Sequence, residues 1–252
     1  MVYSEAGGVS KTTTSVSLAM SAALQGKKVI LIDLDPRAAA THWLDIEPVG
    51  PGLHIGAILG SEDDTAGYAK DLAVQSPWSS NLRVIPSARS VSNREADRAD
   101  HAELRLARSL DGLDADLVVI DCPNRQGGPL TLSALNASDT VIYAAKPDTD
   151  GEEGFVGARE SVQKFVQARE TIGAPVKLRE AGIVVSGLPA IPTRMNRVAI
   201  AQLEETGLLL YPIIPLRTIV QESRATNEWY GNYVKGEVVA AAYDEIARKV
   251  IR

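Results

Sequence analysis

The chain has 252 residues, of which 45% are apolar, and it carries a net charge of −6 with an isoelectric point near 5.2. Such an acidic chain argues against nucleic-acid binding over its whole surface but leaves room for a local basic patch, and the single cysteine, Cys122, excludes an internal disulfide framework. The sequence shows neither a signal-peptide pattern nor an apolar stretch near the ~18 residues of a membrane span, so we expect a reducing, cytoplasmic compartment and no membrane partner.

Buried strand patterns alternate with helical patterns along the chain. After a very short strand at residues 1–4, apolar runs predict strands at residues 27–35, 82–88, 116–123, 139–147, 181–189 and 209–215. Helical patterns lie between them, at residues 11–25, 93–111, 152–172, 194–206 and 237–251, and loops or short helices are expected at residues 46–80 and 187–193. This alternation predicts one α/β domain, residues 1–252, with a mostly parallel twisted sheet and helices on both faces. Ligands of such sheets bind beyond the carboxyl ends of the strands.

The segment SEAGGVSKTTTS, residues 4–15, follows the first strand and opens the first helix. It matches the phosphate-binding pattern G-x-x-x-x-G-K-[ST] at Lys11 and Thr12, but Glu5 and Ser10 stand where that pattern has glycine. The two glycines of the loop would let its backbone approach phosphate oxygens, and the loop amides with the helix N-terminus would form an anion site. A glycine turn that caps an ordinary helix explains this loop alone equally well.

Three acidic residues follow buried strands further along the chain. Asp33 and Asp35 come just after the strand in VILIDLDPRAAAT, residues 29–41, and Asp121 ends the strand in LVVIDCPN, residues 117–124. Acids at buried strand ends are costly unless they serve a metal, a water or an orienting network, and a strand-ending acid supports the Mg²⁺ shell in P-loop ATPases. Each acid alone is explained by an ordinary turn, whereas the three motifs in this order predict a nucleotide and magnesium site.

These motifs carry a family resemblance that extends over almost the whole chain. AGGVSKTT (residues 6–13), DLDPRAAAT (33–41) and DCPN (121–124) resemble the K-G-G-V-G-K-T-T, D-x-D-P-Q-x-x-A-T and D-x-P-P motifs of the ParA/MinD group of P-loop ATPases, which have a deviant Walker A motif. Weaker similarities follow in NLRVIPSA, in SALNASDTVIYAAKPD, where the family has a helix leading into a strand, and in IPTRMNRVAIAQL and IPLRTIVQES. The chain is most similar to ParA-type DNA partition ATPases.

The resemblance implies ATP or ADP with Mg²⁺ as the ligands and assigns roles to residues of this chain. Lys11 and Asp35 would be catalytic, the lysine by holding phosphate charge and the acid by positioning or activating the attacking water. Thr12 and Asp121 would serve the metal, and Asp33 would support the metal or the lysine. The nucleotide-binding residues would be Gly7, Gly8, Val9, Ser10, Lys11, Thr12, Thr13 and, near the adenine, Pro215.

Departures from the family motifs bear on the expected mechanism. Family members carry a signature lysine that reaches the other subunit's phosphates in an ATP-sandwich dimer, and this chain has Ala6 there. Arg37 and Asn124 replace the usual glutamine and proline. We therefore expect a homodimer that depends on ATP and is weaker than the family norm, with very slow basal hydrolysis. Arg125 or Lys146 could replace the missing cation, and the family's use of the loop after the third motif slightly favours Arg125.

The resemblance further implies that ATP-bound dimers bind DNA without sequence preference and that a centromere-binding ParB-like protein stimulates hydrolysis. The cycle would segregate a plasmid, prophage or chromosome, and the protein would be associated with the nucleoid. DNA contacts would come from Arg194, Arg197 and Arg217, in a C-terminal half whose other basic residues include Lys177, Arg179 and Arg224. No N-terminal helix-turn-helix extension is expected.

Two other classes of protein stay open. A MinD-like membrane-associated ATPase would need a basic amphipathic C-terminal helix with large apolar residues, whereas VVAAAYDEIARKVIR, residues 238–252, is rich in alanine and carries two acids. A nucleotide-binding regulator that does not hydrolyse ATP would retain the same motifs, and a turnover assay separates it from an ATPase.

Overall fold

The computed structural model describes residues 1–251 and has an eight-stranded sheet at its centre. In chain order the strands are β1 (Val2–Tyr3), β2 (Val29–Asp33), β3 (Val74–Gln75), β4 (Leu82–Ile85), β5 (Leu117–Asp121), β6 (Thr140–Ala145), β7 (Arg179–Leu188) and β8 (Leu209–Pro215). Their order across the sheet is β3-β4-β2-β5-β1-β6-β7-β8, and every neighbouring pair is parallel except β3–β4. The loop after β1 therefore leaves the middle of the sheet.

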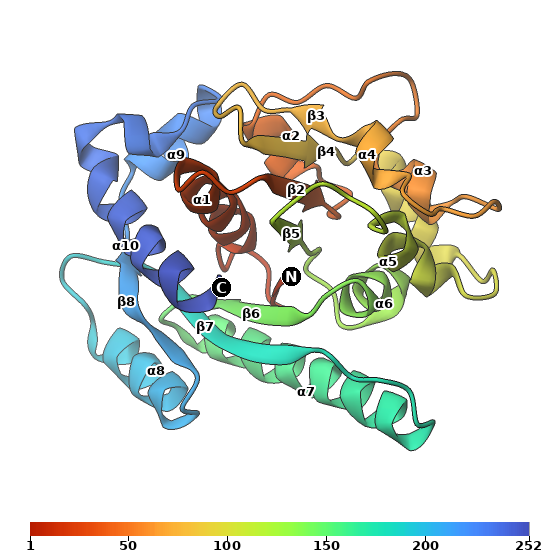
Figure 1. Cartoon of the computed structure of the whole chain (residues 1–252). Helices are drawn as coiled ribbons and strands as arrows, with labels where there is room; N and C mark the ends of the chain where they lie inside the picture. Colours follow the sequence, from red (N-terminus) through yellow and green to blue (C-terminus); the bar gives the residue numbers. More distant parts are fainter. Residues whose placement is uncertain (252) are drawn as a thin grey trace.

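Helices cover both faces of this sheet (Figure 1). One face carries α1 (Lys11–Leu24), α2 (Ala39–Trp43), α9 (Ile219–Ala225) and α10 (Val234–Val250). The other carries α3 (Ile55–Leu59), α4 (Ala69–Leu72), α5 (Arg105–Ser109), α6 (Gly128–Asn136), α7 (Thr149–Thr171) and α8 (Arg194–Glu205). Three 3₁₀ segments, η1 (Arg89–Ala96), η2 (Ala102–Leu104) and η3 (Tyr230–Asn232), complete the connections. Within residues 1–251, no helix combines the length and the apolar character that a membrane crossing requires.

Strand β2 illustrates how the sheet is held between the two helical layers. All five of its residues are buried, and successive side chains point to opposite faces. Val29 and Leu31 join the apolar cluster shared with α1 and α10, while Ile30 and Ile32 join the cluster shared with α6 and α7. A strand buried on both faces has a continuous apolar sequence, which is why its run of Val, Ile and Leu predicted it.

The predicted α/β fold class is confirmed, but the helix predicted over residues 93–111 is wrong. That stretch contains the end of η1, then η2 and the short helix α5. Asp97 lies at the first break: its Oδ1 accepts from the amide of Ala99 (2.9 Å), and its Oδ2 accepts from Arg105 Nη1 (3.2 Å). Such local bonds from an aspartate side chain compete with the helical backbone pattern.

Residue periodicity did not predict α6, α9 or the antiparallel strand β3, whereas the short helices α3 and α4 agree with the expectation for their stretch. Helix α6 begins with Gly128 and Pro129, and proline is favoured at the first helical position; only the family resemblance indicated a helix before residues 139–147. The antiparallel strand β3 and the helices α3 and α4 fall in residues 46–80, which were expected to form loops or short helices, and α9 was not predicted.

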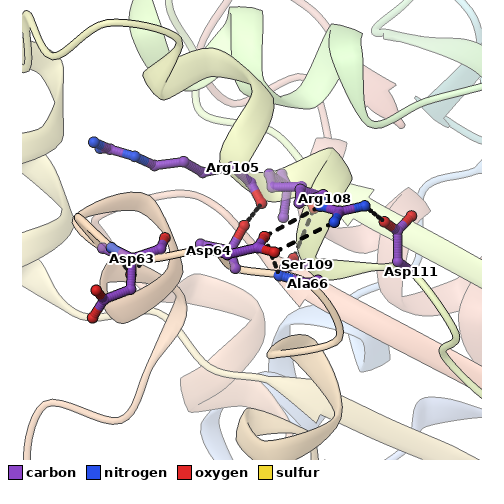
Figure 2. A network of polar contacts seen from close by, with 10 residues as sticks. Asp63, Asp64, Ala66, Arg105, Arg108, Ser109 and Asp111 are labelled. Atoms are coloured by element: carbon purple, nitrogen blue, oxygen red, sulfur yellow. Dashed lines mark hydrogen bonds and ion pairs between the residues drawn. The ribbon is translucent and has the colours of Figure 1, made fainter.

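A surface network of acids and arginines ties the loop after α3 to α5 (Figure 2). Arg108 of α5 forms ion pairs with Asp64, at 3.2 Å from Nε to Oδ1, and with Asp111. The hydroxyl of Thr65 donates to the carbonyl of Arg105 (2.9 Å). Because the charged groups are well exposed, the ion pairs contribute little stability, and the network marks where this loop contacts α5.

All three tryptophans of the chain meet in one cluster. Trp43 of α2 stands edge-on to Trp78 with ring centroids 5.7 Å apart, and the rings of Trp78 and Trp229 are 5.9 Å apart. The guanidinium of Arg224 lies 5.4 Å from the centroid of Trp43. The cluster therefore joins the segment after β2 to α9.

Candidate functional site

The carboxyl ends of the parallel strands border a cleft of about 610 Å³. The loop after β1, the turn after β2, the ends of β6, β7 and β8, and α10 contribute its walls. The predicted site residues that line it are Gly8, Ser10, Lys11, Thr12, Thr13, Asp35, Lys146, Pro215 and Arg217. Residues far apart in the sequence are thus brought to the edge where ligands of such sheets bind.

Two residues of the loop between β1 and α1 have left-handed backbone conformations. Gly8 has φ of 71° and Ser10 has φ of 68°. Ser10 occupies the N-cap of α1 and makes no side-chain cap there. A non-glycine residue in this conformation costs ~1–2 kcal/mol, and such strain is found where the surrounding structure serves a function. The missing glycine before Lys11 has therefore not changed the turn that glycine would favour.

Lys11 opens α1 and is only 7% exposed. Its ammonium donates to the carbonyl of Ala6 across the loop, at 2.6 Å. Burial lowers the pKa of Lys11, and the charge of Asp121 opposes that shift. An ammonium has three donors, so this one retains donors for an anion in the cleft.

Asp121 ends β5 and is fully buried. Its Oδ1 accepts from Ser15 Oγ (2.8 Å), while its Oδ2 has no hydrogen-bond partner within residues 1–251. Burial raises the pKa of Asp121 and the charge of Asp33 raises it further, against the effect of the Thr12 and Ser15 hydroxyls. A carboxylate oxygen without a partner, close to a threonine hydroxyl, fits the oxygen ligands and bound waters that Mg²⁺ takes.

Asp33 and Asp35 have different surroundings. Asp33 is buried, and its Oδ2 accepts from the amide (2.9 Å) and the hydroxyl (2.8 Å) of Thr41. Its Oδ1 accepts from the amide of Asp35 (3.1 Å), and Asp35 Oδ1 accepts from the amide of Arg37 (2.9 Å). These bonds fix the turn that carries Asp35 into the cleft. The geometry gives Asp33 an orienting role, and its support of the metal stays a prediction.

The two candidate cations lie in different places. Lys146 follows β6 and lines the cleft, whereas Arg125 is not among the lining residues and pairs with Glu95 at 3.3 Å between Nε and Oε1. The slight preference for Arg125 therefore lacks support in the geometry.

Of the predicted phosphate-loop residues, Val9 is buried beneath the loop, and Gly7 lies against the side chain of Asn124.

The basic residues of the C-terminal half lie near both ends of β7. Arg194 and Arg197 are exposed near the start of α8. Arg217 lines the cleft, and its Nη1 donates to the carbonyl of Leu216 (2.9 Å). Lys177 lies just before β7, and Arg179 is its first residue. They are therefore at one end of this strand, while its other end leads to α8. The predicted DNA-binding residues thus lie at the start of α8 and on the wall of the cleft, which α8 borders through Asn196.

Hydroxyl residues that support the site were not singled out in the sequence. Besides Ser15 and Thr41, Thr14 Oγ1 lies 3.1 Å from the hydroxyl of Tyr243, which comes from α10 and lines the cleft. The available signal was the run of four hydroxyl residues that follows Lys11. No pattern in the sequence indicated the partner in α10.

Comparisons with known proteins bear on this site. The sporulation initiation inhibitor protein Soj of Bacillus subtilis is 35% identical over 158 residues, which are 61% of this chain and 60% of that protein, so the chain spans less than two thirds of this relative. The chromosome-partitioning ATPase Soj of Thermus thermophilus is 26% identical over 97% of this chain and 92% of its own length. The structure of cobyrinic acid a,c-diamide synthase from Mycobacterium smegmatis with bound ATP analog and magnesium has a TM-score of 0.76 and 26% identity, covering 98% of this chain and 91% of that one.

A family model described as an AAA domain matches residues 1–172. The chain belongs to that family, within the ParA/MinD group of P-loop ATPases. In this ParA/MinD protein, the three motifs that resemble the family lie around the cleft. The region matched by the family model includes all three, in the loop after β1, the turn after β2 and the end of β5.

The buried Asp121 of this ParA/MinD protein predicts a pH-dependent stability. Because its pKa is raised in the folded state, the unfolded chain ionises first, and the ligand-free protein loses stability as pH rises from ~4 toward neutrality. Asp121→Asn should remove that contribution, a slope of up to ~1.4 kcal/mol per pH unit. Urea denaturation of both proteins between pH 5 and 8 measures the difference. Parallel curves would contradict a raised pKa for Asp121.

Proposed function

We propose that this protein binds ATP with Mg²⁺ in the cleft and hydrolyses it slowly. The observation that carries the proposal is a buried ammonium, Lys11, and a buried carboxylate, Asp121, next to the phosphate-type loop. Within residues 1–251 they form no ion pair with each other. Lys11 retains free donors, and one oxygen of Asp121 has no hydrogen-bond partner. Buried charges are normally paired or coordinate a metal. A phosphate anion and a divalent cation would satisfy both groups.

The residues around the loop fit such a ligand. Residues 7–13 would hold the phosphates with backbone amides and the N-terminus of α1, and Lys11 would balance their charge. Thr12 and Asp121 would hold Mg²⁺, which when bound neutralises phosphate charge and orients the terminal phosphate. Pro215, on the cleft wall formed by β8, would lie near the base.

Asp35 is the residue best suited to act on the attacking water. It lies in the cleft, and the bonds from Arg37 and to Asp33 hold its turn in place. A carboxylate positioned in this way can orient a water and accept its proton. The regulator that binds but does not hydrolyse ATP would retain the fold of this turn, so turnover distinguishes the two proteins.

Titration calorimetry with ATP and ADP, with Mg²⁺ and with a chelator, tests the proposal, together with a phosphate-release assay. We expect binding that Mg²⁺ strengthens and slow release of phosphate. A chain that binds neither nucleotide would contradict the proposed site, and binding without release would identify the regulator.

We further propose that ATP binding controls attachment to DNA and that a ParB-like protein stimulates hydrolysis, in a cycle that segregates a replicon in association with the nucleoid. The names of the two Soj relatives and the exposed arginines of α8 support this proposal. An ATP-dependent homodimer would provide two such helices. The MinD-like alternative is less well supported, because four of the large apolar residues of α10, Val239, Tyr243, Ile246 and Val250, are buried in the body of the protein, which leaves only Val234 and Val238 exposed near its start.

Replacing Arg194 and Arg197 together by alanine should weaken ATP-dependent DNA binding by about 10-fold or more on every sequence, and it should flatten the dependence on salt. Both effects follow from the loss of phosphate contacts and of the counterions that they release. Fluorescence anisotropy with two unrelated duplexes at several salt concentrations measures them. Lys177→Ala with Arg179→Ala is the matched control, and an equal loss in the control would move the DNA contacts to the other end of β7.

A further inference from the structure

We propose that Lys146 supplies a second cation to the phosphates within the same copy of the chain, so that one subunit prefers ATP to ADP without a lysine from another subunit. This inference rests on the proposed nucleotide site. It concerns a residue outside the three principal motifs, just after strand β6 rather than in the loop that follows β1.

The position of Lys146 next to the phosphate-type loop is the first argument. β6 is the neighbour of β1 in the sheet, so the residue after β6 and the loop after β1 leave the same edge side by side. Lys146 lines the cleft, and its Nζ comes within 4.0 Å of the place where a side chain on Gly8 would begin. Lys11 contacts the same loop at Ala6. The two ammonium groups therefore approach the loop at positions two residues apart.

The second argument is that the ammonium of Lys146 has no competing partner. Among residues 1–251 it forms no ion pair and no hydrogen bond, although the side chain is half-buried. Of the arginines that line the cleft, Arg217 bonds to the carbonyl of Leu216 and Arg224 lies over Trp43, while Arg37 is exposed on the turn after β2 and is the remaining rival. An unpaired ammonium beside an anion site is available to a phosphate.

The third argument is that the backbone of Lys146 is held firmly. Helix α7 lies so close that a side chain at Gly151 would begin 2.2 Å from the carbonyl oxygen of Lys146. Asp148 caps α7 by accepting from the amide of Gly151 (2.9 Å), and Asn196 of α8 donates to the carbonyl of Pro147 (2.7 Å). A fixed backbone reduces the entropy that the lysine loses when it contacts a ligand.

These features predict a preference for the triphosphate. ATP carries one more negative charge than ADP, and the proposal places the ammonium of Lys146 beside that additional phosphate. Lys146→Ala should lower the affinity for ATP by ~10-fold or more, the size expected for one charge-assisted hydrogen bond. The affinity for ADP should fall by a smaller factor, about threefold or less. Lys146→Arg, which keeps the charge, should retain most of the preference.

The experiment is calorimetry of the full chain with Mg-ATP and Mg-ADP, with light scattering at the same concentrations to identify the monomer. Lys164→Ala is the matched control, because it removes one lysine charge from an exposed position of α7 that does not line the cleft. The expected result is a selective loss of ATP affinity in monomeric Lys146→Ala, with the control unchanged.

Several results would overturn the inference: an unchanged ATP affinity in Lys146→Ala, an equal loss for ATP and ADP, or a loss seen only in the dimer. A selective loss in Arg37→Ala, with Lys146→Ala unchanged, would assign the second cation to the turn after β2. Wild-type protein that binds neither nucleotide would instead overturn the proposed function itself, so the two failures are distinguishable.

Discussion

Lys11→Ala should lower the affinity for Mg-ATP by at least ~100-fold. The substitution removes a buried ammonium from the start of α1, and two charge-assisted hydrogen bonds to phosphate at ~1.5 kcal/mol each correspond to that factor. Because the wild-type ammonium is buried before any ligand binds, its removal relieves a desolvation cost, and the ligand-free variant should remain folded. Its melting temperature, measured by circular dichroism, checks that point separately from calorimetry with ATP.

Lys164→Ala is the matched control for this experiment, since it removes the same charge from the exposed side of α7. It should bind ATP as the wild type does. Unchanged binding in Lys11→Ala, with an intact fold, would show that the nucleotide site lies elsewhere. Equal losses in both variants would indicate that net charge, and not contact with the ligand, determines affinity.

Asp35→Ala should bind Mg-ATP with little change but release phosphate at least ~100-fold more slowly than the wild type, the usual scale for losing a positioned acid or base. Asp35→Asn keeps the shape of the side chain and should be similarly slow, because an amide accepts a proton poorly. Asp63→Ala, on the exposed loop drawn in Figure 2, is the control and should turn over normally.

A phosphate-release assay under saturating ATP, combined with calorimetry, separates chemistry from binding. Reduced binding with normal turnover of the bound fraction would assign Asp35 to the metal or the phosphates instead. In that case Asp121→Ala should be the variant that binds but does not turn over, and the roles of the two acids would be exchanged.

The central strands and the first motifs could be predicted because their causes are local. The run of Val, Ile and Leu in β2 reflects burial on both faces, and parallel strands bring Asp35 and Asp121 to one edge. Partners that come from distant segments could not be predicted. The ion pair of Arg125 with Glu95 depends on η1, which was not predicted. The end of a strand placed Lys146 at the ligand-binding edge of the sheet, but its approach to Gly8 in particular could not be predicted.

The basic residues illustrate the same limit in another form. Arg179 and Arg194 are close in sequence, yet β7 is extended between them and spans ten residues, about 33 Å at the usual rise of ~3.3 Å per residue. Basic residues that are close together in the sequence are therefore not necessarily close together on the surface. In residues 93–111, good helix formers were outweighed by the side-chain bonds of Asp97, which a count of propensities does not include.

The tryptophan cluster makes the intrinsic emission of this protein a local probe. Trp43, Trp78 and Trp229 lie close enough for energy transfer between their indole rings, and the arginine over Trp43 places a charge where the emission of that ring should respond to it. Trp43 follows the turn that holds Asp35, and Trp229 follows α9. A shift in the emission maximum on adding a ligand would therefore report a rearrangement at this junction. Movements confined to α7 or α8 would leave the emission unchanged.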